Sequence, residues 1–112
     1  MKSVDWKTQQ IKDTPHKVDV RPLYDKPEVQ VMHIKLQPGE QLKPHLTPVD
    51  VFFFVLEGSP DILVGDERKT IPAGILVESP KNIVHCLYNS SDDQARIMVV
   101  KAPKPTQNAR IL

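Results

Sequence analysis

The chain has 112 residues but only one cysteine, Cys86, so no disulfide can form within it. Proteins without disulfides are typical of reducing compartments, and a cytoplasmic location is therefore expected. Glycine is also scarce, with four residues, whereas proline occurs eleven times. This balance favours short strands joined by stiff connections over helices. The length is enough for one domain and not for two.

A strongly basic surface and a long apolar run are both missing. Lys and Arg number 15 against 14 Asp and Glu, and the basic residues are scattered singly along the chain. Nucleic-acid binding requires a basic stripe or patch, so no nucleic-acid partner is expected. No apolar run approaches the ~20 residues of a membrane span. The first ten residues, MKSVDWKTQQ, lack the apolar core of a secretory signal.

Short apolar runs separated by turn residues make up most of the chain. Helical periodicity is weak and confined to the first dozen residues. Turn signals such as Pro38-Gly39 and Gly65-Asp66 separate the runs. The pattern predicts an all-β sandwich or barrel. The runs predicted as strands are residues 17–23, 28–36, 49–56, 61–64, 68–71, 75–78, 83–88 and 94–101.

A spaced motif in the second half of the chain resembles the second motif of the cupin superfamily. That motif is Gly, five residues, Pro, one residue, Gly, two residues, His, three residues, Asn. Gly74, Pro80, His85 and Asn89 stand at this spacing, and Asn82 occupies the position of the second glycine. Asn is the next best residue for a left-handed turn, so the departure is mild.

The first cupin motif is present in a degenerate form. Gly39, His45 and Gly58 are in place, but Thr47 stands at the second histidine position and Val51 at the glutamate position. The resemblance covers roughly residues 28–103. It implies a double-stranded β-helix, or jelly-roll barrel, open at one end. Residues 1–27 would then be an N-terminal arm, and residues 104–112 a peripheral tail.

The resemblance also implies a metal site. In intact cupins three imidazoles and one carboxylate hold a divalent metal such as Zn, Ni, Mn, Fe or Cu. Transferred residue by residue, the set leaves His45 and His85 as metal ligands, since Thr47 is a poor ligand and Val51 is none. The alternative is that both histidines are hydrogen-bonding groups of a metal-free pocket floor.

Two further side chains are candidates for completing the site. His33 lies in a predicted strand and would replace the missing imidazole if it faced inward; more often a lone strand histidine is simply buried. Asp50 is the nearest carboxylate, but strand alternation places it opposite Val51 unless a bulge shifts the register. Otherwise Asp50 caps a turn or faces solvent. His16 is expected to be exposed.

Strand alternation predicts a pocket around the two histidines. The odd-numbered residues from His45 to Val55 can share one face. They would form a largely apolar cavity with a few polar groups, which is the usual character of a small-molecule site. The expected lining residues are His33, Thr47, Val51, Phe53 and Val55.

The run from Val51 to Leu56 is apolar on both strand faces. A strand of this kind needs cover on both sides. The N-terminal arm, anchored by Trp6, or a second subunit would supply it, and a homodimer is expected. Cys86 is expected to be a small packed hydrophobe.

Two functions compete on this pattern. The first is a small-molecule-binding cupin with a weak or absent metal. The alternative is a metal-dependent cupin enzyme, an oxygenase, isomerase or decarboxylase acting on a small organic acid or sugar. The enzyme would need a third protein ligand, from His33 or Asp50. A third possibility is an interaction module whose barrel interior is filled by side chains and has no cavity.

Overall fold

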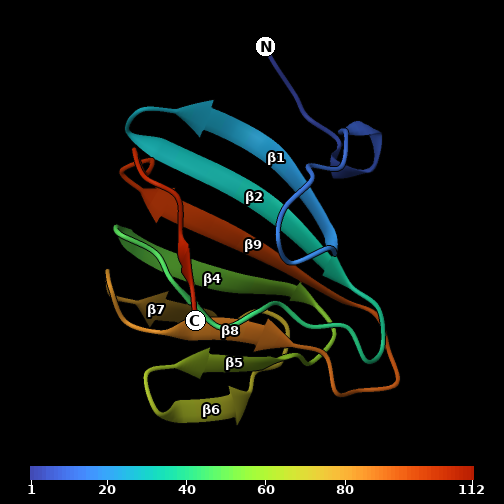
Figure 1. The fold of residues 1–112 in the computed structure, drawn as a ribbon. Coiled ribbons are helices and arrows are strands. Elements are labelled where there is room, and N and C mark those ends of the chain that lie inside the picture. Colours follow the sequence, from blue (N-terminus) through green and yellow to red (C-terminus); the bar gives the residue numbers. More distant parts are fainter.

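The computed structural model describes residues 1–112 and contains two antiparallel sheets of five strands each (Figure 1). The first sheet has the order β1-β2-β9-β4-β7 and the second β10-β3-β8-β5-β6. The elements are η1 (Trp6–Thr8), β1 (Asp19–Lys26), β2 (Val29–Leu36), β3 (His45–Leu46), β4 (Asp50–Glu57), β5 (Asp61–Val64), β6 (Glu67–Thr70), β7 (Leu76–Ser79), β8 (His85–Tyr88), β9 (Ala95–Ala102) and β10 (Arg110–Ile111). The predicted all-β architecture is confirmed.

The core lies between the two sheets and follows from strand alternation. In β4, Val51, Phe53 and Val55 are buried, while Phe52 and Phe54 on the opposite face are half-buried. In β9 the residues that share the inward face are Ala95, Ile97, Val99 and Lys101. The inward face of the first sheet is thus apolar over most of its length. Its apolar character ends at Lys101.

Two turn residues with positive φ connect the strands of the two sheets. Gly58 follows β4 with a φ of 80°, and a Cβ there would lie 2.5 Å from the carbonyl oxygen of Gln94, so only glycine fits. Asn82 has a φ of 60°, as expected for a residue that replaces a motif glycine. Its backbone N–H donates to the carbonyl of Thr47 at 2.9 Å. The second motif therefore fixes the position of a first-motif residue.

The terminal segments take part in the sheets. Residues 1–27, expected to form an arm, include β1, which pairs with β2 along the edge of the first sheet (Figure 1). Residues 104–112 include β10, which pairs with β3. Sequence patterns did not predict β3 or β10, because a two-residue strand carries no alternation. No helical segment has the length and apolar character needed to cross a membrane.

Candidate functional site

His45 and His85 meet because their strands pair at these two residues. β3 and β8 are joined in the register His45↔His85. The two Nε2 atoms lie 3.1 Å apart, and the rings are in an edge-to-face arrangement with centroids 4.5 Å apart. Both side chains are buried. The structure therefore brings together the two histidines that the motifs single out.

The hydrogen bonds of the pair determine its tautomers. The carbonyl of Lys43 can only accept, so the Nδ1–H of His45 donates to it at 2.7 Å. In neutral His45 the Nε2 atom is then an acceptor. The Nε2–H of His85 donates to it, and His85 Nδ1 accepts from the hydroxyl of Ser79 at 2.7 Å. Thr47 Oγ1 lies 2.9 Å from the same His85 Nε2. Both rings are thus held in fixed orientations.

The pair forms part of the wall of a cavity of about 560 Å³. This volume is within the ~300–1,000 Å³ typical of small-molecule sites. Apolar side chains from β2, β4 and β9 face the histidines, and segments near both termini close the remaining side. The residues that line the cavity include Lys12, Asp13, His16, Met32, Ile34, His45, Thr47, Val51, Phe53, His85, Val99 and Lys101.

Three histidines and three lysines are among the polar residues that line this cavity. Burial, followed by the charges of His45 and Lys101, lowers the pKa of His85 from 6.5 to about 3. Burial likewise lowers the pKa of His16 to about 4 and shifts the pKa of His45 downward. Burial is also the main cause that lowers the pKa of Lys101. The imidazoles are therefore neutral at pH 7.

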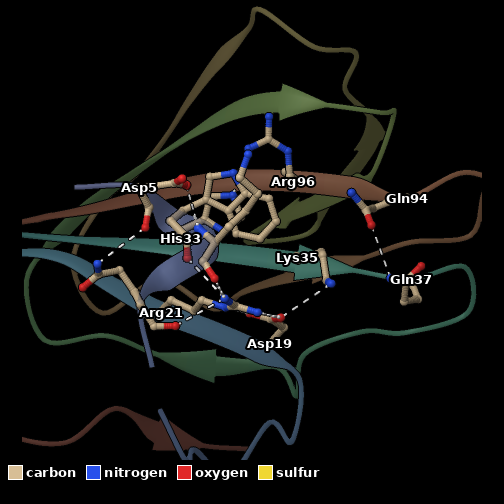
Figure 2. Close-up of polar contacts among 11 residues, drawn as sticks. Asp5, Asp19, Arg21, His33, Lys35, Gln37, Gln94 and Arg96 are labelled. Carbon is tan, nitrogen blue, oxygen red and sulfur yellow. Dashed lines mark hydrogen bonds and ion pairs between the residues drawn. The ribbon is translucent and has the colours of Figure 1, made fainter. Parts of the chain in front are cut away.

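Two residues expected in the pocket lie elsewhere. His33 is buried on the opposite face of β2 from Met32 and Ile34, where it stacks on Trp6 and its Nε2 accepts from Arg96 at 3.1 Å. Figure 2 shows His33 among the side chains of Arg21 and Arg96. Strand parity excludes His33 from the cavity, contrary to the expectation. Val55 shares the face of Phe53 but is fully buried in the core and does not line the cavity.

Asp50 takes the turn-capping position that was the alternative to metal ligation. Its side chain is exposed, and Oδ1 accepts from the backbone N–H of Lys81 at 2.9 Å. Val51 points inward, so alternation directs Asp50 away from the histidines. Cys86 is fully buried in the apolar core and its thiol contacts the carbonyl of Leu42.

Sequence patterns missed three residues of the site. His16, expected to be exposed, is half-buried, and its Nδ1 accepts from the backbone N–H of Lys43. Its ring lies 4.7 Å from that of His45. Ser79 and Lys101 were also missed. The parity of Lys101 with Val99 could have revealed it, but no local signal brings His16 to the barrel mouth.

A sequence profile of the cupin domain matches residues 32–101, more than half of the chain. The chain belongs to the cupin family. Among curated proteins there is no match.

Solved structures share this fold. The polyketide cyclase RemF from Streptomyces resistomycificus aligns with a TM-score of 0.85 at 18% identity, over 100% of this cupin and 85% of RemF. The TT1209 protein from Thermus thermophilus aligns with a TM-score of 0.81 at 27% identity, over 94% and 100% of the two chains. An RmlC-like cupin with a double-stranded β-helix fold from Methanocaldococcus jannaschii aligns with a TM-score of 0.72 at 27% identity, over 86% and 89%.

Cupins often bind metals, and the residues of this cupin fit two of the ligands. The Nε2 atoms of His45 and His85 lie 3.1 Å apart, a separation that suits two neighbouring ligands of an ion bound at ~2.0–2.1 Å. His45 Nδ1–H already donates outward to Lys43, whereas His85 would have to change tautomer, so that its Nδ1–H donates to Ser79 and its Nε2 is free for the metal. No group of three or more His, Cys, Asp or Glu comes together in a metal-binding arrangement. Metal ligation by His45 and His85 therefore stays a prediction.

Proposed function

We propose that this cupin binds a small organic molecule in the cavity beside His45 and His85. The observation that carries the proposal is the cavity itself, about 560 Å³ with apolar walls and convergent polar groups. A barrel filled by its own side chains, as an interaction module would have, lacks such a space. A neighbour of the same fold is a polyketide cyclase, which is consistent with small-molecule binding.

The apolar and the polar residues of the cavity wall contact different parts of the ligand. Val51, Phe53 and their apolar neighbours contact the hydrocarbon part of the ligand. The hydroxyl of Thr47 and the Nε2–H of neutral His16, whose Nδ1 accepts from the backbone N–H of Lys43, offer hydrogen bonds to the polar part of the ligand. Fixed polar groups in an apolar site give binding specificity, because a mismatched ligand leaves them unpaired.

Protein-observed NMR with a library of small organic compounds tests this proposal. Binding should shift the signals of Val51 and Phe53 and leave those of the exposed Leu76 and Ile83 unchanged. Shifts confined to the exposed residues would place binding outside the cavity. The absence of any binder in a broad library would contradict the proposal.

Neither His33 nor Asp50 supplies the third ligand that the enzyme would need, so the spacing of the two Nε2 atoms supports a more limited second candidate, a divalent-metal site held by His45 and His85. A bound divalent ion would act as a Lewis acid toward a coordinated oxygen. Zinc or nickel titration of the wild type against His45→Ala and His85→Ala tests it, with His33→Ala as the matched control outside the cavity. The candidate requires metal binding by the wild type and the control and its loss in both site variants. Equal binding by all proteins would place the metal elsewhere.

A further inference from the structure

Lys101 is the one lysine that the inward face of β9 carries into the cavity. Strand alternation places it on the face of Ile97 and Val99, and it stands opposite Val51 on β4. Its other register partner is Gln30 of β2, which also lines the cavity. Burial lowers its pKa and the charge of nearby Lys12 lowers it further.

The lysine has no counterion within the protein. Neither Lys101 nor Lys12 takes part in any ion pair, and neither ammonium group has a hydrogen-bond acceptor. The one carboxylate that lines the cavity, Asp13, is bound to Lys17 at 2.7 Å. The Lys101 ammonium thus lines the cavity without a carboxylate beside it, and a bound anion would pair with it through charge-assisted hydrogen bonds.

We propose that the cavity selects an organic carboxylate, with its oxygens against the Lys101 ammonium and its apolar body against Val51 and Phe53. This inference rests on the proposed small-molecule function and names the ligand class of the same site. A charged oxygen pair satisfies the ammonium with charge-assisted hydrogen bonds. The Nε2–H of neutral His16 adds a further donor to the cavity.

The apolar walls favour a carboxylate with a hydrocarbon body over an inorganic anion. Met32, Ile34 and Val99 line the cavity together with Val51 and Phe53. A fully hydrated phosphate would lose its water shell against these side chains without replacement hydrogen bonds. An aromatic or branched carboxylate buries its apolar part there and keeps only its charged end at the lysine.

The test compares benzoate with benzamide, which have nearly the same shape and differ in charge. Isothermal titration of the wild type should show at least about tenfold tighter binding of benzoate. Lys101→Met should lower benzoate affinity at least about tenfold and leave benzamide unchanged, while Lys101→Arg should retain benzoate binding. Lys69→Met is the matched control, because the Lys69 side chain is 67% exposed on β6.

The outcomes separate this inference from the proposed function. Equal affinities of the wild type for the two probes overturn the carboxylate inference and leave small-molecule binding intact. Unchanged benzoate affinity in a folded Lys101→Met protein would also overturn the carboxylate inference and leave small-molecule binding intact. If neither probe binds at about 10 mM the inference fails, and the proposed function fails only if the compound library also yields no binder. Thermal unfolding checks that each variant is folded, and the comparison of the two probes on the wild type needs no variant.

Discussion

The imidazole of His33 stacks on the indole of Trp6, with ring centroids 4.2 Å apart and planes inclined by 12°. Three cations surround the same indole: the guanidinium carbons of Arg96 and Arg21 lie 5.2 and 5.3 Å from its centroid, and Lys35 Nζ lies 6.0 Å away. Arg21 also donates to the backbone carbonyls of Trp6 and of two residues that follow it (Figure 2). Trp6 thus fixes the N-terminal segment to the outer face of the first sheet.

Replacing Trp6 should release this segment. Trp6→Ala removes a stacked aromatic pair worth ~0.5–1.5 kcal/mol and cation–π contacts worth ~0.5–1 kcal/mol each. We expect a loss of about 1–3 kcal/mol in the free energy of unfolding, measured in urea, and faster tryptic cleavage after Lys7. Val4→Ala, at a side chain that is 51% exposed, should change neither quantity. Unchanged cleavage in Trp6→Ala would contradict the anchoring role.

His33 should make stability depend on pH. Its Nε2 accepts from Arg96 and its buried Nδ1 has no partner. Burial, followed by the charge of Arg96, lowers its pKa from 6.5 to about 4. The other charged groups around the ring are Asp19, Arg21, Lys35 and Glu57. Its stabilising contribution is present above pH 6.5 and is lost as pH falls toward 4, because the unfolded chain binds the proton first.

Urea unfolding at pH 7 and pH 5 checks this dependence. The wild type should lose about 1–2 kcal/mol more between the two pH values than His33→Gln does, since glutamine does not titrate. The buried histidines of the cavity contribute equally to both proteins and cancel in the comparison. Parallel losses in the wild type and the variant would show that His33 does not titrate differently on unfolding.

Asn82 should tolerate glycine but not valine. Its φ of 60° is a left-handed conformation that a β-branched residue adopts only with strain. Asn82→Val should cost about 1–2 kcal/mol, whereas Asn82→Gly should be nearly neutral. Thermal unfolding of the two variants measures the difference. Equal melting temperatures for both would contradict the importance of this turn.

The outer face of β4 predicts association of two copies. Phe52 and Phe54 point away from the cavity and are only half-buried, and they pair with Val100 and Met98 of β9. We expect a homodimer at micromolar concentration by light scattering, and a shift toward monomer in Phe54→Lys. Ile83→Lys, at a side chain that is 39% exposed, is the control. A monomeric wild type would contradict the prediction.

Local sequence patterns were sufficient for the longer strands and for the turns between them, but not for the two-residue strands β3 and β10. Alternation in β4 predicted that Val51 and Phe53 point inward, and the motif spacing predicted the left-handed turn at Asn82. Each of these features depends on backbone geometry over a few residues, which side-chain size and branching control directly. The same parity rule applied to β9 would have identified Lys101 as inward-facing.

Only the tertiary structure decided which face of β2 points inward and which residues line the cavity. His33 and Met32 lie on faces of similar apolar character, so either face could have been inward; the docking of Trp6 on the His33 face occupies the outer side. His16 comes from a turn near the N-terminus and reaches His45 only because the chain crosses the barrel mouth. Contacts between segments distant in sequence depend on how whole sheets pack, and no local pattern encodes them.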